Sequence, residues 1–248
     1  MYYYGKVFLS NENGYYQIVL ANNIERMKAI FLTTNTEVWV SADQVDNGTV
    51  FDRYFPTVCG VVYLGEYSTL DKDGNTTKEY TAWGCMVDRC YGNKELEAYK
   101  YCIVSEEFHN ASYFKDWYNK QVGAHREDFY LDKDILSGEC KVYAEDTCVL
   151  VPQEVNSFFV KHNNKKVKSN LPTGVMFNPK HTSRPFTAMY SGHGGEKHET
   201  YHDNKWSAFL AYKQAKENRA KELAEKWRGQ IDNRVYEKLI NYKVLLTD

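Results

Sequence analysis

The chain has 248 residues, of which 43% are hydrophobic and 26% are charged, and its formal net charge is -2. This length and composition are typical of a globular protein with one large domain or two to three small ones. No apolar run approaches the roughly 18 residues of a membrane-spanning helix, and the first residues lack the pattern of a signal peptide, so we expect no membrane partner.

Residues 1–66 are predicted to form a small β-rich domain. Short runs of strand-forming residues are separated in part by turn residues at 11–14 and 33–36. These runs are Tyr2–Tyr4, Tyr15–Leu20, Lys28–Leu32 and Glu37–Val40. The last two indicate a hairpin, and a further short strand is expected between Gly60 and Gly65. No catalytic pattern occurs in this domain.

Residues 67–160 are predicted to form a second domain. Apolar residues from Tyr80 to Cys90 fall at helical spacing, with Thr77 as the candidate N-cap, and therefore predict a core helix. Ser112 is a candidate cap for a second, shorter helix. Its inward-facing residues are expected to be Phe114, Trp117 and Tyr118.

The stretch 130–156 follows the order strand, turn, strand, helix. The first strand ends near 131–134, a turn contains Gly138, and the second strand spans Cys148–Val151. The helix begins near Pro152 and carries Asn156. This order resembles that of a ββα-metal nuclease finger, and the resemblance implies one polar side chain at the end of the first strand and another on the helix, both facing one divalent cation.

The six cysteines form no C-x-x-C pair. We interpret them as small, buried, reduced residues. The alternative is a structural zinc site, which needs four ligands gathered from distant positions. Its candidate ligands are Cys90, Cys102, Cys140 and Cys148.

Residues 161–170 form a basic, polar linker. Residues 1–160 carry 14 Lys and Arg against 24 Asp and Glu, a net charge of -10, whereas residues 161–230 carry 14 against 6, a net charge of +8. This division favours a nucleic-acid contact in the later part of the chain, with Lys165, Lys166 and Lys168 contacting phosphates. The alternative interpretation is a solvated hinge followed by a solvated helix.

Residues 171–248 are predicted to form three strands followed by helices. The strands are Thr173–Phe177, Phe186–Tyr190 and Lys197–Tyr201. Asp203 or Asn204 caps a long helix from about Lys205 to Trp227, Gly229 ends it, and a last helix spans about 233–242. The apolar stripe of the long helix is expected to comprise Trp206, Phe209, Leu210, Ala220, Leu223 and Trp227.

This C-terminal part resembles the Apetala-type plant DNA-binding domain and its phage relatives. The resemblance is carried by Leu171–Val175, by Phe186–Met189, and by Ala208–Tyr212 together with Ala215. It implies a three-stranded sheet that lies in the major groove of duplex DNA and a helix that packs behind it. The first strand is rich in arginine in this family, whereas the first strand of this chain has few basic residues. The candidate DNA-binding residues of the sheet are instead Lys180, His181, Arg184, Lys197 and His198.

The middle of the chain resembles phage-encoded proteins of the HNH homing-endonuclease type, in which HNH and Apetala-type modules often share one chain. The matching stretches are YTAWGCMVDRCY at 80–91, the pair Phe114 and Trp117, LDKDIL at 131–136, and CVLVPQEVN at 148–156. The two resemblances together cover roughly residues 58–248. They imply an α+β fold with a ββα-metal middle, duplex DNA as partner, and the host cytoplasm as location.

The resemblance also assigns roles within the ββα stretch. Lys133 falls where the family has its catalytic His, Thr147 where a structural Asn is expected, and Asn156 matches the final Asn or His. The implied catalytic residues are Asp132, Lys133 and Asn156, and the implied ligands of Mg²⁺ or Mn²⁺ are Asp132, Asp134 and Asn156. A lysine is a poor base near neutral pH unless it is strongly desolvated. The candidate histidines to replace it are His109, His125 and His162.

Three functions therefore stay open. The first is a metal-dependent DNA endonuclease of HNH type. The second is a DNA-binding regulator without catalysis, and the third is a phage protein whose acidic N-terminal part binds a host protein.

Overall fold

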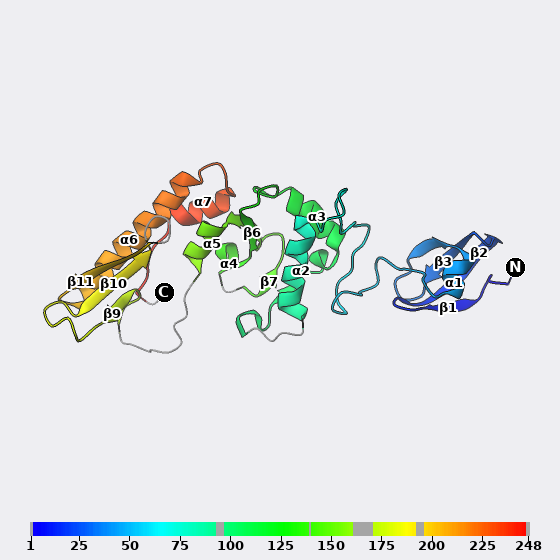
Figure 1. The fold of residues 1–248 in the computed structure, drawn as a ribbon, viewed down its shortest axis with the longest axis horizontal. Helices are drawn as coiled ribbons and strands as arrows, with labels where there is room; N and C mark the ends of the chain where they lie inside the picture. Colours follow the sequence, from blue (N-terminus) through cyan, green and yellow to red (C-terminus); the bar gives the residue numbers. More distant parts are fainter. Residues whose placement is uncertain (1, 93–96, 139, 161–170, 192–195, 247–248) are drawn as a thin grey trace. The chain divides into compact units, whose positions relative to one another are not determined.

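The computed structural model describes residues 2–92, 97–138, 140–160, 171–191 and 196–246 (Figure 1). They divide into two compact units, Met1–Lys120 with Glu139–Cys148, and Gln121–Gly138 with Val149–Asp248. Helices and several small sheets are mixed along the chain, as the predicted α+β class requires. Among the described residues, no helix has both the length and the apolar character needed to cross a membrane.

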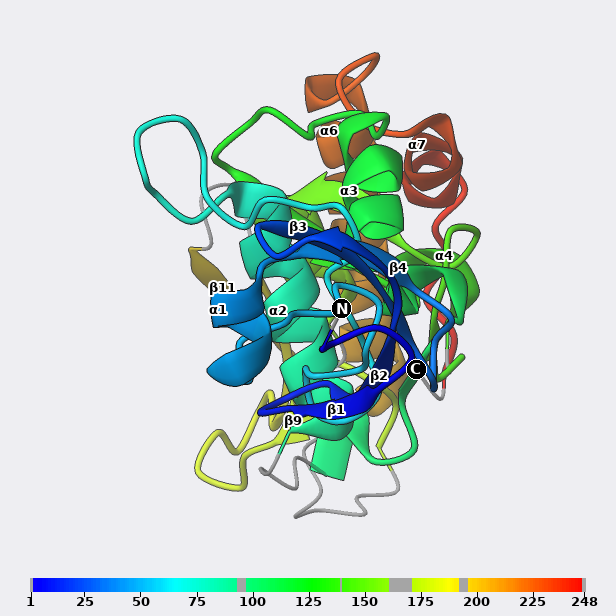
Figure 2. The same ribbon diagram turned by 90° about the vertical axis from the view of Figure 1, so that its right-hand side faces the viewer.

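The first unit begins with a four-stranded antiparallel sheet in sequential order (Figure 2). Its strands are β1 (Val7–Ser10), β2 (Gly14–Asn23), β3 (Arg26–Phe31) and β4 (Glu37–Val40), and α1 (Ala42–Asp46) follows. Alternate residues of β2 and β3 enter a common core, because side chains along a strand alternate between its faces. The predicted hairpin is confirmed, since β3 pairs with β4.

Two strand predictions in this region are wrong. Residues Tyr2–Tyr4 precede the sheet, because Gly5 turns the chain with a positive φ of 76° before β1 begins. The residues between Gly60 and Gly65 form only isolated bridges, Val58 with Val62 and Tyr63 with Asn110. Both of those glycines also have positive φ, a conformation that ends regular strand pairing.

The remainder of the first unit is mainly helical. It contains α2 (Lys78–Tyr91), the short 3₁₀ helices η1 (Glu97–Tyr99) and η2 (Glu107–His109), and α3 (Ala111–Asn119), with a parallel pair β5 (Ile103–Val104) and β7 (Val142–Tyr143). Thr77 caps α2 as predicted. The cap of α3 is Asn110 and not Ser112, whose hydroxyl instead donates to the carbonyl of Leu64.

The second unit contains the stretch predicted as strand, turn, strand, helix. Strand β6 (Phe129–Asp132) pairs antiparallel with β8 (Val149–Pro152), and α5 (Gln153–Phe159) contacts both strands. One turn of helix, α4 (Asp134–Ser137), precedes Gly138. We call β6, α4, β8 and α5 the ββα element.

The C-terminal part confirms the prediction of three strands and a long helix. Strands β9 (Val175–Phe177), β10 (Phe186–Ser191) and β11 (Lys197–His202) form an antiparallel sheet in the order β11-β10-β9. Helix α6 (Lys205–Lys226) packs along this sheet, and α7 (Asn233–Ile240) packs against α6 (Figure 1). Their shared core comprises Val175, Ala188, Ala208, Phe209 and Val244.

Gly174 fixes how closely this sheet approaches the helix. Its φ is +75°, and a Cβ placed there would lie 2.2 Å from the ring of Tyr212 on α6. Any larger residue would therefore both strain the backbone and displace that ring. This requirement gives a physical reason for the glycine in the Leu171–Val175 stretch.

The predicted apolar stripe of α6 is only partly correct. Phe209 and Leu223 are buried, but Trp206 is 52% exposed and Leu210 is 62% exposed. Trp206 and Leu210 are four residues apart and share one side of the helix. The core of the three-stranded sheet takes Ala208 and Phe209 instead, so this neighbouring side stays open to solvent.

Candidate nucleic-acid interface and the ββα element

Asp132 lies at the end of β6 and holds the start of α4. One of its carboxylate oxygens accepts hydrogen bonds from the backbone N–H groups of Asp134 and Ile135, each at 2.8 Å. Burial raises the pKa of Asp132, and these two hydrogen bonds only partly oppose that effect. The carboxylate predicted to bind a metal thus accepts hydrogen bonds from the first two N–H groups of α4.

Lys133 is almost fully buried, with 3% of its side chain exposed. Its ammonium group forms an ion pair with Asp134, whose side chain is 59% exposed. The same positive charge lowers the pKa of Asp132, although burial is the larger effect there. An ammonium of the protein itself therefore lies beside the two carboxylates that were predicted to hold a divalent cation.

The other two residues assigned by the HNH resemblance, Asn156 and Thr147, belong to different units. Asn156 is half-buried on α5. Thr147 is buried in the first unit, where its hydroxyl donates to the carbonyl of Val142 at 2.8 Å and accepts from the N–H of Ala144 at 2.9 Å. Among the described residues, no group of three or more His, Cys, Asp or Glu side chains is arranged to hold a metal ion.

Two of the candidate replacement histidines lie within the described residues, and neither is part of the ββα element. His109 lies in η2 of the first unit, with its Nε2 at 3.1 Å from the carbonyl of Val104. His125 is exposed in the segment before β6. His162 lies outside the described residues. Within the described ranges, His109 and His125 therefore form no metal-binding group with Asp132 and Asp134.

Glu154 on α5 links the ββα element to α6. Its Oε1 accepts a hydrogen bond from Nε1 of Trp227 at 2.7 Å and pairs with Lys226, and its Oε2 lies 3.3 Å from Arg219. Burial alone would raise the pKa of Glu154, but the hydrogen bonds from Lys226 and Trp227 outweigh it and hold that pKa below its usual value. This contact was not foreseen from the sequence, because its partners lie 65 to 73 residues further along the chain.

Two further cations strengthen the same junction. The guanidinium of Arg126 lies 4.9 Å from the ring centre of Phe129 and 5.1 Å from that of Trp227. The ammonium of Lys216 donates to the backbone carbonyl of Phe158 at 2.9 Å. These residues therefore join β6 and α5 to α6 within the second unit.

The cations of the C-terminal sheet lie in a different environment. Lys180 and Arg184 are exposed in the loop between β9 and β10, and Lys197 is exposed at the start of β11. Within the described part of the chain, none of these three forms an ion pair with a carboxylate. Most cations of the helical region do, as in Lys213–Glu217, Arg219–Glu222, Lys226–Glu154, Arg228–Glu225 and Arg234–Asp232.

Strand register divides the predicted DNA-binding residues between two faces of the sheet. Ala188 faces α6, so its neighbour Thr187 and the cross-strand partner Tyr201 lie on the opposite face, which we call the open face. On this face Tyr201 is exposed, whereas Thr187 in the central strand is buried. Lys197 shares the open face with Tyr201, whereas His198 lies on the other face and stacks on Tyr190.

The open face also gains a residue from the loop between β9 and β10. The ring of His181 lies 4.8 Å from that of Tyr201. The hydroxyl of Tyr201 donates to Glu199 at 3.0 Å, and this hydrogen bond raises the pKa of Tyr201. The structure thus brings His181 and Lys197 to one face and does not bring His198 with them. Lys165, Lys166 and Lys168 lie outside the described residues.

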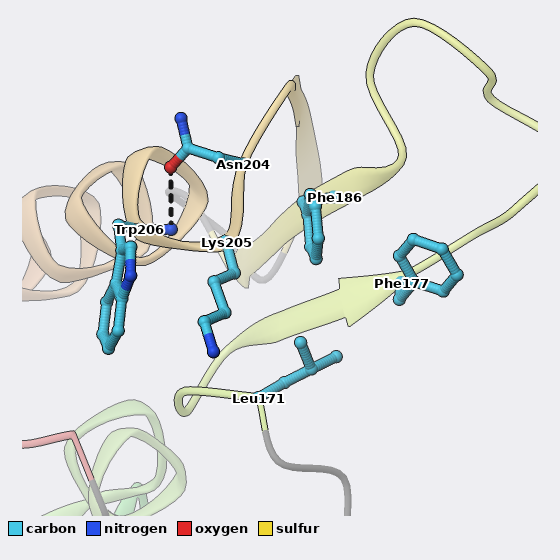
Figure 3. Close-up of a pocket in the computed structure, with 6 residues that line it drawn as sticks. All are labelled: Leu171, Phe177, Phe186, Asn204, Lys205 and Trp206. Atoms are coloured by element: carbon cyan, nitrogen blue, oxygen red, sulfur yellow. Dashed lines mark hydrogen bonds between the residues drawn. The ribbon is translucent and has the colours of Figure 1, made fainter.

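An apolar groove of about 680 Å³ lies where α6 begins beside β9 and β10 (Figure 3). Sequence reasoning missed it, because it assigned Trp206 to the core. Its lining residues are Leu171, Phe177, Phe186, Asn204, Lys205 and Trp206.

Comparison of the chain with protein-family models, curated proteins and solved structures gives no match.

Proposed function

We propose that this protein binds duplex DNA through its C-terminal sheet and the loop between β9 and β10. The observation that carries the proposal is the contrast in cation pairing. Lys180, Arg184 and Lys197 are exposed, and no described carboxylate pairs with them, whereas Lys213, Arg219 and Lys226 of α6 each form an ion pair with a carboxylate of the protein. Only a cation without an internal partner is fully available to a phosphate.

The open face of the sheet supplies further groups for contact with DNA. His181, Tyr201 and Glu199 present ring, hydroxyl and carboxylate groups beside Lys197. Polar side chains of these kinds bind base edges and sugars, while the cations bind phosphates. The resemblance to the Apetala-type domain, in which a sheet of this kind lies in the major groove, supports the same assignment.

Fluorescence anisotropy with a labelled duplex tests the proposal. The triple variant Lys180→Ala, Arg184→Ala, Lys197→Ala is expected to bind at least about tenfold more weakly, because phosphate contacts dominate affinity. The matched control removes three cations that are already paired, with Lys213→Ala, Arg228→Ala and Arg234→Ala, and should bind within about threefold of the wild type. An equal loss in both variants would contradict the proposal, since total charge alone would then explain binding.

Metal-dependent cleavage by the ββα element is a second candidate function. It is favoured by the contact between β6 and α5, which carry Asp132 and Asn156 respectively. Nicking of a supercoiled plasmid in Mg²⁺ or Mn²⁺ tests it, with Asp132→Ala and Asn156→Ala as variants. Metal-dependent nicking that disappears in both variants supports the endonuclease, and binding without nicking supports a DNA-binding protein alone.

The N-terminal sheet favours a host protein as a further partner. The face of this sheet opposite its core exposes apolar residues, among them Leu9, Tyr15 and Trp39, and Arg26 lies 4.7 Å from the Trp39 ring. Exposed apolar patches with Trp and Arg are typical of protein interfaces. Capture of a defined host protein from nuclease-treated lysate, lost with Trp39→Ser, would support this partner, and identical capture by both forms would reject this face as its site.

A further inference from the structure

The groove where α6 begins combines flat aromatic surfaces with a single positive charge. Trp206 and Phe177 are each 52% exposed, and the rings of Phe177 and Phe186 lie 5.3 Å apart. The ammonium of Lys205 lies 5.1 Å from the centre of the Trp206 ring. In Figure 3, Trp206 lies at one end of the labelled side chains and Phe177 at the other, with Lys205 and Leu171 between them.

The chemistry of this lining restricts the occupant. The residues that line the groove include no carboxylate, and within the described chain Lys205 forms no ion pair. A ligand that complements the groove therefore has a flat apolar surface that packs on the rings and a negative charge that pairs with Lys205. A nucleotide has both, because its base stacks on aromatic side chains and its phosphate pairs with a cation.

The surroundings of the groove are also positively charged. Phe177 and Phe186 border the loop that contains Lys180 and Arg184, the exposed cations proposed above to bind phosphates. The basic stretch 161–170, with four lysines and one histidine, directly precedes Leu171 in the sequence. A nucleic acid that contacts Lys180 and Arg184 thus lies beside the end of the groove formed by Phe177 and Phe186.

Phe186 packs with the core on the α6 side of the sheet and pairs with Phe177, so the groove lies on the face opposite the open face. We infer that it binds one unpaired nucleotide of DNA held by the loop between β9 and β10, with its base stacked on Trp206 or Phe177. This inference rests on the proposed function and deepens it. The nucleotide must be unpaired, because the faces of a paired base are already covered by its neighbours in the duplex. A bulge or a single-stranded overhang supplies such a base without the cost of opening the duplex.

The test compares two labelled duplexes, one fully paired and one with a single-nucleotide bulge that carries the fluorescent base 2-aminopurine. The full-length protein is expected to bind the bulged duplex about tenfold more tightly, in line with the usual strength of base–aromatic stacking, and to quench the 2-aminopurine fluorescence. Trp206→Ala or Phe177→Ala should reduce both effects while leaving affinity for the paired duplex unchanged.

Two matched variants separate stacking from general effects on folding. Trp206→Phe keeps an aromatic ring and should retain most of the preference for the bulge. Leu210→Ala, on the same helix and 62% exposed but outside the groove, should behave as wild type.

Equal binding of the two duplexes without quenching would overturn the inference and leave the proposed function intact. A bulge preference that survives in both Trp206→Ala and Phe177→Ala would overturn it as well. Failure to bind either duplex would instead contradict the proposed function, and the inference would fall with it.

Discussion

The ββα element and the C-terminal sheet use the same kinds of residues in opposite ways. In the ββα element, Asp132 accepts hydrogen bonds from the backbone of α4, Lys133 is buried beside carboxylates, and Glu154 binds residues of α6. In the sheet, Lys180 and Lys197 extend into solvent with no described carboxylate as partner. Charged groups of the first region hold the fold together, whereas those of the second are available to a ligand.

The difference shows that residue type alone does not identify a functional site. A buried charge is costly unless it is paired, so a polar residue inside a junction is committed to its neighbours. An exposed charge costs little and contributes little to stability, so the fold alone does not account for its presence. The two regions should therefore respond differently to substitution, one in stability and the other in binding.

The largest expected effect is the loss of Glu154. Glu154→Ala should lower the free energy of unfolding by about 3 kcal/mol, because it leaves the indole N–H of Trp227 without its acceptor and leaves the mostly buried Arg219 with the exposed Glu222 as its ion-pair partner. Urea denaturation measures the change. The control Glu225→Ala removes only an exposed partner of Arg228 and should cost less than about 0.5 kcal/mol. Similar losses of unfolding free energy for both variants would show that Glu154 does not link α5 to α6.

Substitution of Lys133 is expected to give the next largest loss of stability. Two variants distinguish the contribution of its packing from that of its charge. Lys133→Ala should cost about 2–3 kcal/mol, because it removes a buried aliphatic stem. Lys133→Met keeps most of that stem and should cost less than about 1 kcal/mol, since its ion-pair partner Asp134 is largely exposed. Thermal unfolding of the two variants distinguishes these outcomes, and a larger cost for Lys133→Met would indicate that the charge itself is required.

Acid should weaken the junction through Glu154. The pKa of this group in the folded protein is below its usual value, so its stabilisation is fully present above about pH 4.3 and is lost as the pH falls through the folded pKa. The difference in unfolding free energy between wild type and Glu154→Gln should therefore shrink between about pH 5 and pH 3. A constant difference across this range would contradict the assignment.

Asp132 is expected to show the opposite pH dependence to Glu154 and the smallest effect on the free energy of unfolding. Its pKa in the folded protein is raised, so its favourable contribution is present below about pH 3.9 and is lost as the pH rises through the folded pKa. Asp132→Asn keeps an oxygen acceptor for the N–H groups of Asp134 and Ile135. It should be neutral or stabilising by up to about 1 kcal/mol at pH 7 and neutral near pH 3. Strong destabilisation at pH 7 would show that the ionised carboxylate is needed.

Local sequence signals predicted the elements well. Thr77 caps α2, Phe114 and Trp117 are buried on α3, and the three C-terminal strands and α6 form as expected. Capping and helical periodicity depend on residues within a few positions of one another, so they are visible in the sequence. The predicted strand at Tyr2–Tyr4 does not form, because the positive φ of Gly5 outweighs the strand preference of its neighbours.

The environments of the candidate site residues depended on distant contacts. The burial of Lys133 and the binding of Glu154 by Trp227 follow from packing between segments far apart in the chain. The exposure of Trp206 depends on how much of α6 a three-stranded sheet covers. Helical spacing shows which residues share a face, but it does not show how far the covering sheet extends.

The salt dependence of duplex affinity tests the central contrast most directly. For the sheet variant Lys180→Ala, Arg184→Ala, Lys197→Ala, the slope of log affinity against log salt should decrease in magnitude by roughly 2.7, at about 0.9 for each lost phosphate contact. The paired-cation control Lys213→Ala, Arg228→Ala, Arg234→Ala should change the slope by less than about 1. Equal changes in the two variants would contradict the division between cations that hold the fold and cations that hold DNA.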